Sequence, residues 1–446
     1  MSSTEFAAST AVPQPSRRVV IAACFGHGVE WFEFGVYGYL ATVLGKLFFP
    51  SENPTTSILS SLAVFGVAFV ARPFGAVLFG HLGDKFGRRA ILATTILLMG
   101  GATAAIGLLP TYASIGIAAP ILLITCRLIQ GLSAGGETSG AATFLAECAP
   151  PKRRGLWTSS IQSVGILSFV TAALLVAGLN AWLGADTMAD WGWRIPFLLS
   201  FPLSMAGLYL RFKVEETPAF QVALKKEHLQ EKAPLKQLLA NYKKPLLLLI
   251  AIVAVEAVSS YIAKTYLPTY LINTIGLSTT TALLSTSVTL VFAACLIPFY
   301  AILSDRIGRK PLLIWGTVAL IIVAIPAFLL IGSGSIAGAI GGQILAIIPG
   351  TAISTAVVVT QAELFPTHVR YSGAALGYNS AYAMFGGTAP FVAAALIAAT
   401  DSKLMPAFYL VVIGVIGLIV MTRLPETSKR NMDDAVRPLD PAAAAV

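Results

Sequence analysis

The sequence predicts an all-α membrane protein with twelve transmembrane helices in two pseudo-symmetric six-helix halves. Three observations lead to this fold class: the composition, the placement of the charges and an internal repeat. Hydrophobic residues make up 56% of the 446 positions and charged residues only 11%, with a mean hydropathy of +0.79, which excludes the soluble globular class. Because a helix needs about 20 apolar residues to cross the hydrocarbon core, roughly twelve helices fit into this length.

The lysines and arginines follow the positive-inside rule. If the N-terminus is cytoplasmic and the spans alternate, most of the 30 Lys and Arg residues fall on the cytoplasmic side. Three exceptions fall on the outer side, namely Lys46, Arg194 and Lys403. Three more lie within spans, namely Arg72, Arg127 and Lys264. We therefore expect a multi-pass protein of the inner or plasma membrane with both termini in the cytoplasm. The net charge of +9 needs no nucleic-acid partner.

The chain begins with a polar segment over residues 1–16, which we expect to be a disordered cytoplasmic tail. The first six predicted spans lie at about 17–47, 57–82, 89–109, 117–147, 155–183 and 193–212. The other six lie at about 245–273, 280–303, 311–332, 336–362, 369–399 and 404–423. We therefore divide the chain into an N-terminal half at 17–213, a charged cytoplasmic linker at 214–244, a C-terminal half at 245–424 and a short tail at 425–446.

A charged, glycine-containing loop occurs once in each half. The first copy is Gly80-His81-Leu82-Gly83-Asp84-Lys85-Phe86-Gly87-Arg88-Arg89, and the second is Leu303-Ser304-Asp305-Arg306-Ile307-Gly308-Arg309-Lys310. The pair Glu147 and Arg154 after the fourth span likewise corresponds to Glu363 and Arg370 after the tenth. Such doubling is typical of transporters that bind their substrate between two halves, and it indicates alternating access.

The pattern G-x-x-x-D-[RK]-x-G-R-[RK] between the second and third spans resembles the signature loop of the major facilitator superfamily, and the resemblance covers nearly the whole chain. Four further segments resemble its metabolite:proton symporters: Glu30-Trp31-Phe32-Glu33-Phe34, Ala71-Arg72-Pro73-Phe74-Gly75, Gly135-Gly136-Glu137 and Trp191-Gly192-Trp193-Arg194-Ile195-Pro196-Phe197. Members of that family carry proline and betaine, α-ketoglutarate, citrate, shikimate and related acids. The resemblance implies the major facilitator fold and secondary transport.

The loop charges are the predicted gating residues: Asp84, Arg88, Glu147, Asp305, Arg309 and Glu363. A carboxylate at a membrane surface can accept hydrogen bonds from the free amides of a helix N-terminus. The resemblance implies that Asp84 faces the start of span 11 and Asp305 that of span 5. It also implies pairs of Arg88 with Glu147 and of Arg309 with Glu363, formed when the cytoplasmic side is closed. The alternative is that these residues only set the topology.

Ionisable side chains within spans are the candidate site, because each is costly unless it is paired or hydrated. Helical spacing places them on shared faces, which we expect to meet in one polar interior: Glu30, Glu33 and Tyr37; Arg127, Gln130 and Glu137; and Glu256, Ser260 and Lys264. Arginine stays charged when buried and can hold a carboxylate by two parallel hydrogen bonds. The predicted substrate-binding residues are Arg72, Arg127, Lys264, Tyr37, Gln130, Tyr378 and Asn379. Alternatively, Arg127 pairs with Glu137 or Glu30.

The coupled proton needs a carboxylate that titrates near physiological pH, which burial in an apolar site can achieve. The first candidate is Glu33 and the second is Glu137. Glu30 is the third, with a structural role as a hydrogen-bond acceptor as its alternative.

The sequence lacks Walker A, GxSxG, HExxH and CxxC motifs, so we expect no enzyme, no metal and no cofactor besides the proton gradient. The leading hypothesis is proton-coupled uptake of a small carboxylated metabolite, of the di- or tricarboxylate or α-keto acid type, by a monomer in the lipid bilayer. Lys264 favours such an acid, because a quaternary ammonium group would be repelled by it. The alternative is proton-coupled uptake of proline or glycine betaine. A sensor or scaffold that moves nothing is disfavoured by the desolvation cost of the buried charges.

Overall fold

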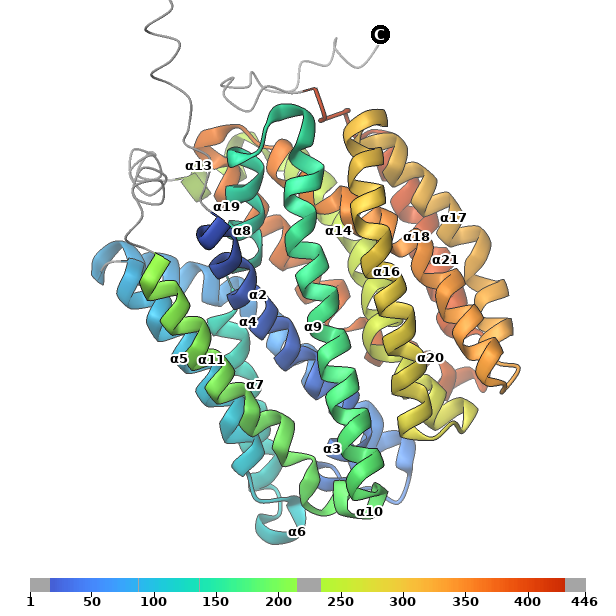
Figure 1. The fold of residues 1–446 in the computed structure, drawn as a ribbon. Coiled ribbons are helices and arrows are strands. Elements are labelled where there is room, and N and C mark those ends of the chain that lie inside the picture. The colour runs from blue at the N-terminus through green and yellow to red at the C-terminus, as the bar shows by residue number, and fades with distance from the viewer. Residues whose placement is uncertain (1–16, 87, 136, 215–233, 430–446) are drawn as a thin grey trace, which may run out of the picture.

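The computed structural model describes residues 17–86, 88–135, 137–214 and 234–429, and every regular element in these ranges is a helix (Figure 1). The helices lie side by side along one direction, as expected for a membrane bundle. Of the described helices, seven are long and apolar enough to cross a membrane by length and composition, and four more are apolar but shorter. The predicted all-α membrane fold is confirmed.

The N-terminal half contains the first six predicted spans as α2 (Arg17–Tyr39), α4 (Pro54–Phe86), α5 (Arg88–Leu108), α7 (Ala118–Ser133) with α8 (Glu137–Cys148), α9 (Arg154–Leu183) and α11 (Arg194–Val214). The fourth span is therefore two helices. Short helices join the spans: α3 (Ala41–Phe48), α6 (Tyr112–Ile115), α10 (Ala185–Thr187), a 3₁₀ turn (Pro151–Arg153) and a π-helical turn (Met188–Gly192).

The C-terminal half starts with α13 (Pro234–Asn241) and contains the remaining spans. The seventh comprises α14 (Lys243–Tyr261), η3 (Ile262–Tyr266), α15 (Leu267–Tyr270) and η4 (Leu271–Ile275). Single helices form the next three: α16 (Thr279–Ile307), α17 (Arg309–Ile331) and α18 (Ile336–Glu363). The last two are α19 (Thr367–Ala381) with η5 (Tyr382–Gly386) and α20 (Ala389–Thr400), and α21 (Met405–Met421). The elements η3, η4 and η5 are π-helical, which is frequent at functional sites.

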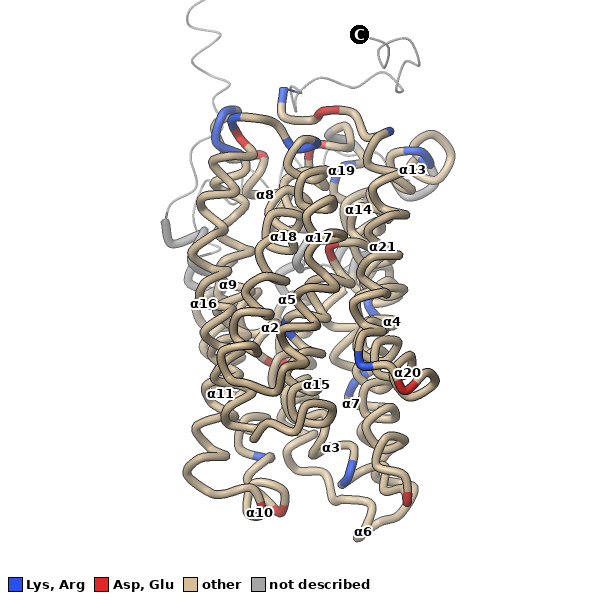
Figure 2. The backbone as a smooth tube through the Cα atoms, turned by 90° about the vertical axis from the view of Figure 1, so that its right-hand side faces the viewer, with Lys and Arg blue, Asp and Glu red and all other residues tan. Residues whose placement is uncertain are grey.

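The chain enters and leaves the bundle at the same end, which we call the termini side (Figure 1). Helices α8, α13 and α19 lie near this side, whereas α3, α6 and α10 lie at the opposite side. Figure 2 shows that charged residues concentrate at the termini side and are sparse along the middle of the bundle. This distribution is what a membrane-spanning protein needs, because lipid cannot solvate charges.

The two halves pack through equivalent helices. Helix α9 runs alongside α16, and α4 contacts α19, η5 and α20 (Figure 1). The first contact joins span 5 to span 8 and the second joins span 2 to span 11, so the interface repeats the doubling of the sequence. The halves therefore meet along two seams, with the core between them.

Glycines allow α4 and α7 to approach closely within the N-terminal half. A Cβ atom at Gly75 would overlap the backbone of Leu132, and one at Gly131 would overlap the backbone of Ala68. Without a side chain at these positions, the two backbones come into direct contact, as small residues permit between membrane helices. Span 4 therefore packs closely on α4 at Gly131.

Candidate functional site

A small cavity of about 20 Å³ lies between the two halves, large enough for about one water. The N-terminal half contributes α2, α8 and α9 to its wall, and the C-terminal half contributes η3, α18, α19 and η5. Its polar and aromatic lining residues are His27, Trp31, Gln162, Lys264, Gln361, Tyr378 and Tyr382. The position between the halves is where an alternating-access protein binds its substrate.

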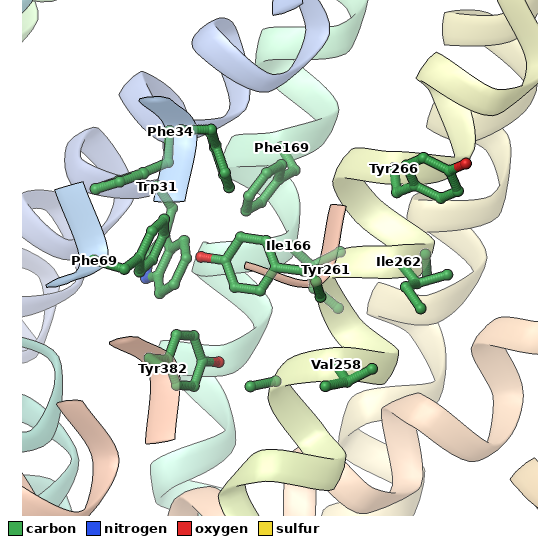
Figure 3. Packing of buried hydrophobic residues seen from close by; sticks show 14 of the residues in the cluster. Trp31, Phe34, Phe69, Ile166, Phe169, Val258, Tyr261, Ile262, Tyr266 and Tyr382 are labelled. Atoms are coloured by element: carbon green, nitrogen blue, oxygen red, sulfur yellow. The ribbon is translucent and has the colours of Figure 1, made fainter. Parts of the chain in front are cut away.

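Aromatic side chains from both halves meet beside this cavity (Figure 3). Trp31 of α2 lies 6.2 Å, between ring centroids, from both Tyr261 and Tyr382 of the other half. Phe69 of α4 lies 5.2 Å from Tyr261 in an edge-to-face arrangement. Such pairs stabilise an interface beyond the area they bury, so these rings hold the halves together at mid-height.

Lys264 of η3 places a cation at the cavity wall. Its side chain is 5% exposed, and its Nζ lies 5.1 Å from the ring centroid of Phe169 and 5.5 Å from that of Trp31. Among the described residues, the ammonium group forms no hydrogen bond or ion pair. Ring faces attract cations, but they leave the N–H donors of Lys264 available for an incoming acceptor.

Glu256 of α14 is a buried carboxylate that the sequence placed on one helical face with Lys264 but to which no binding or proton-coupling role was assigned. The hydroxyl of Tyr382 donates to it at 2.8 Å from Oε2 and 3.1 Å from Oε1. Tyr382 in turn stacks on Tyr378, with 4.3 Å between ring centroids, and both tyrosines line the cavity. Glu256 is therefore connected to the cavity through Tyr382. Its location within a span was the signal in the sequence that could have identified it.

Arg72 has a partner within the protein rather than a place at the cavity. Its Nη2 donates to Oε1 of Glu30, and both side chains are fully buried. The guanidinium group also lies over the rings of Phe34 and Phe69, at 4.6 and 4.7 Å from their centroids. The Nε and Nη1 atoms have no hydrogen-bond partner among the described residues. Glu30 was one of the two alternative partners for Arg127 in the sequence, but the described hydrogen bonds of Arg127 go to Gln130 and to the backbone of Phe65.

Arg127 and Glu33 belong to one hydrogen-bond network inside the N-terminal half. Arg127 donates to Oε1 of Gln130 at 3.0 Å and to the carbonyl oxygen of Phe65 at 3.1 Å. Glu33 accepts from the hydroxyls of Thr103 at 2.6 Å and Ser204 at 3.2 Å. Both residues are buried and neither lines the cavity.

The remaining predicted substrate-binding residues divide into two groups. Tyr378 lines the cavity, as Lys264 does. Tyr37 donates to the carbonyl oxygen of Ser61 at 3.2 Å, and Asn379 donates to that of Gly135 at 2.7 Å, across the two halves. Helix packing thus brings a backbone carbonyl group to each of Tyr37 and Asn379. Gln130 is occupied as well, by the side chains of Arg127 and Thr103. The side chain of Glu137 lies outside the described part of the chain.

The two halves are joined at the termini side by the charged loops. Oδ1 and Oδ2 of Asp305 accept hydrogen bonds from the backbone N–H groups of Gly155 at 2.9 Å and Leu156 at 3.0 Å, at the start of α9. Arg309 makes two bonds to Glu363, at 3.0 and 3.1 Å. The contacts that the resemblance implied for Asp305 and Arg309 are present, and their role in gating stays a prediction.

Further ion pairs at the termini side also join the halves. Glu147 pairs with Arg370 at 2.7 Å, and Arg154 lies 3.7 Å from Glu363. The side chains of Asp84 and Arg88 lie outside the described part, so their predicted contacts remain predictions. The Glu147–Arg370 and Arg154–Glu363 pairs each join one half to the other, so they hold the halves together at this side of the bundle.

The opposite side is also bridged. Asn273 of η4 donates to Oγ1 of Thr42 at 2.9 Å, and Asn180 of α9 donates to Oγ1 of Thr280 at 3.1 Å. The halves are therefore in contact at both ends, and the cavity described above lies between these contacts.

A carboxylate beyond the last span caps α17. Glu426 accepts hydrogen bonds from the backbone N–H groups of Arg309 at 2.9 Å and Lys310 at 3.1 Å. Gly308 precedes them with a φ of 104°, a conformation that favours glycine. Burial alone would raise the pKa of the Glu426 carboxyl, but the backbone hydrogen bonds outweigh it and hold the pKa below its usual range.

Comparisons with known proteins agree with this architecture. Residues 20–389 match the family model described as Major Facilitator Superfamily. The proline/betaine transporter of Escherichia coli (strain K12) is 40% identical over 427 residues, which cover 94% of this chain and 85% of that protein. The glycine betaine/proline/ectoine/pipecolic acid transporter OusA of Dickeya dadantii (strain 3937) is 39% identical over 427 residues, with the same coverage. The crystal structure of a D-xylose-proton symporter superposes with a TM-score of 0.73 at 19% identity, covering 92% of this chain and 98% of that one.

Proposed function

The chain belongs to the major facilitator superfamily, and from this premise we propose that it takes up a zwitterionic osmolyte of the proline or glycine betaine type together with a proton. The relatives named as proline/betaine transporters support this choice of solute, because each aligns over nearly the whole chain. The di- or tricarboxylate that the sequence analysis preferred has no such support. The driving force is the proton gradient, without a further cofactor.

The observation that carries the proposal is the ammonium group of Lys264 at the cavity wall. A zwitterion has a carboxylate, which Lys264 can accept as a charge-assisted partner. It also has a cation, which the rings of Tyr378 and Tyr382 in the cavity wall can accommodate. In the sequence, the charge of Lys264 in span 7 argued against proline or betaine. This objection does not hold if Lys264 contacts the carboxylate of the solute. Lys264 binds the anionic end of the solute, at a distance from the cationic end.

Alternating access would proceed by separation of the two halves at one side at a time. The positive-inside rule makes the termini side cytoplasmic, in the inner membrane. There the Asp305 and Arg309 contacts, with their repeats at Asp84 and Arg88, would hold the cytoplasmic side closed, together with Glu147 and Glu363. The domain boundaries proposed from the sequence fit this motion, since residues 17–213 and 245–424 would move as two bodies.

Glu33 is our first candidate for the coupled proton. Its described partners are the hydroxyls of Thr103 and Ser204, which can serve either the charged or the neutral carboxyl group. Glu30 is less suited, because its bond to Arg72 favours a permanent charge. Glu137 remains a candidate from the sequence, and Glu256 joins the set through its link to the cavity.

The experiment uses purified protein in liposomes with a trapped pH dye and no imposed gradient. Proline, glycine betaine, α-ketoglutarate, citrate, succinate and shikimate are added one at a time, with protein-free liposomes as the leak control. Internal acidification by proline or betaine above the control is the expected result. Acidification only by the organic acids would overturn the choice of solute, and no response to any of them would overturn proton symport of this class.

A variant tests the role of Lys264 in the same assay. Lys264→Met removes the charge and keeps an unbranched apolar side chain. Because a hydrogen bond to a charged group contributes about 1.5–3 kcal/mol, we expect the affinity for proline to fall by about tenfold or more. Unchanged affinity would remove Lys264 from the substrate site.

A further inference from the structure

Gln361 of α18 is a buried amide without a hydrogen-bond partner in the part of the chain that the structure describes. Its side chain is 0% exposed, and neither Nε2 nor Oε1 forms a hydrogen bond to any described residue. Buried polar groups are almost always satisfied in native proteins, because an unmade hydrogen bond in a dry site is costly. Gln361 lines the cavity between the halves, which has room for about one water in this arrangement. A solute can supply the missing partners once the halves move apart and widen the cavity.

A second glutamine of the same helix shows that this arrangement is not forced by the fold. Gln343 is also buried, but its Oε1 accepts from Thr286 at 2.9 Å, and its Nε2 donates to Ser285 at 3.0 Å and to the carbonyl oxygen of Ala339 at 3.1 Å. Where the amide has a structural role, the bundle satisfies both of its ends. At Gln361 it satisfies neither.

The groups around Gln361 show which ligand chemistry fits. Lys264 lines the same cavity and offers N–H donors. His27 also lines the cavity, and its Nδ1 accepts a bond from Nε1 of Trp31. The amide of Gln361 adds donors at Nε2 and one acceptor at Oε1. Two donor groups suit a carboxylate, and the acceptor suits an N–H group close to that carboxylate.

We propose that Gln361 recognises the N–H group of the transported zwitterion, with Nε2 donating to its carboxylate and Oε1 accepting from its ammonium N–H. The inference rests on the proposed function and narrows it to solutes that keep an N–H on the cationic nitrogen, as proline does. Glycine betaine has a quaternary nitrogen and would leave Oε1 unpaired. A site built to hydrogen-bond a substrate group discriminates strongly against an analogue that lacks the group.

Three ligands test this recognition with the ring and carboxylate held constant: L-proline, N-methyl-L-proline and N,N-dimethyl-L-proline. Their cationic forms carry two, one and no N–H groups. Binding to the purified full-length protein is measured by titration calorimetry. For the wild type we expect the affinity to fall by about tenfold or more between the monomethyl and dimethyl compounds. For Gln361→Leu we expect that ratio to shrink to within about twofold. The bulk of the second methyl group affects the wild type and Gln361→Leu alike. The difference between their monomethyl-to-dimethyl affinity ratios therefore reports the hydrogen bond to the N–H group.

Gln343→Leu is the matched control, since it removes a satisfied amide from the same helix. It should lower the melting temperature and keep the wild-type ratio. Gln361→Leu should not lower the melting temperature of the ligand-free protein, because the substitution removes no hydrogen bond to a described residue. An unchanged ratio in Gln361→Leu would overturn the inference while the proposed function stands, and so would a destabilised ligand-free protein with normal binding. If the wild type binds none of the three compounds, the inference falls, and a further titration with glycine betaine then decides the proposed function: binding would keep it, and no binding would overturn it too.

Discussion

Glu33 and Arg127 are joined by two uncharged side chains and do not contact each other. Gln130 accepts from Arg127 at 3.0 Å and donates to the hydroxyl of Thr103 at 2.6 Å, and that hydroxyl donates to Glu33 at 2.6 Å. Because neutral groups separate the charges, Glu33 can change its protonation state while the bonds of Arg127 to Gln130 and Phe65 remain in place. The network holds the carboxyl group in position without fixing its charge.

Substitution of Glu33 by Gln tests the proton site. The neutral amide mimics the protonated acid, so we expect loss of uphill accumulation, with the final concentration ratio across the membrane falling to about one. Exchange of labelled solute should continue, since exchange needs no net proton movement. Proteoliposomes with and without an imposed pH gradient measure both activities. Unchanged accumulation would rule Glu33 out, and loss in Glu256→Gln instead would move the proton site to the C-terminal half.

Thr103→Val removes the hydroxyl that links Glu33 to Gln130 and keeps the shape of the side chain. Both partners then lose a bond in a buried site, so we expect destabilisation of about 1–3 kcal/mol. Thermal unfolding of the purified protein measures the change. Thr103→Ser retains the hydroxyl and should remain close to the wild type. A loss in Thr103→Ser together with wild-type stability in Thr103→Val would show that packing of the methyl group, and not the network, is what matters.

Asp305→Asn weakens the contact between the second charged loop and the start of α9. One of the two bonds from the N–H groups of Gly155 and Leu156 becomes a neutral one, and the other is lost because an amide nitrogen cannot accept it. The ion pair with Arg309 is lost as well. We expect turnover to fall by about tenfold, with substrate affinity nearly unchanged. Asp84→Asn should act in the same way if the repeat is functional. A large loss of affinity at normal turnover would contradict the gating role.

Glu426→Gln tests the cap on α17. The carboxylate is partly exposed, so we expect a loss of about 1 kcal/mol at neutral pH after allowance for screening by solvent. The folded-state pKa lies below the unfolded value, so this stabilisation is complete above the unfolded pKa and disappears as the pH falls through the folded one. Melting curves of the wild type and the variant should therefore converge below about pH 4. A constant difference across that range would exclude the charge as its origin.

Gly131→Ala tests the close approach of α7 to α4. The added methyl group would overlap the carbonyl group of Ala68, and we expect a loss of about 1–3 kcal/mol. Gly101→Ala is the control, because nothing lies within 4 Å of a Cβ atom there and alanine favours the helix. It should be neutral or slightly stabilising. Tolerance of both substitutions in a thermal unfolding assay would mean that the helices can move apart at no cost.

Hydropathy and charge placement were sufficient to predict the helical spans, because lipid imposes both on any bundle of this kind. Spacing also placed Lys264 correctly in the interior. The partner of each buried charge could not be found in this way. Arg72 lies 42 positions after Glu30, and many pairings of acids and bases satisfy the same helical spacing.

Uncharged partners were harder still to anticipate. Glu33 is held by Thr103 and Ser204, which are common residues of membrane helices and carry no signal of their own. The π-helical turns η3 and η5 also change the local period, so a regular helical wheel does not predict which side chains of spans 7 and 11 face the cavity. Gln361 is the clearest case, since only the structure shows that its amide is unsatisfied.

The small volume of the cavity also bears on how a cell conserves energy. Protons cross a membrane readily along a continuous file of hydrogen-bonded water, and a space for about one water cannot hold such a file. In this arrangement, this cavity by itself gives protons no continuous path through the described part of the protein. A cell can keep many idle copies in its membrane without dissipating the ion gradient that its other transporters and its ATP synthesis depend on.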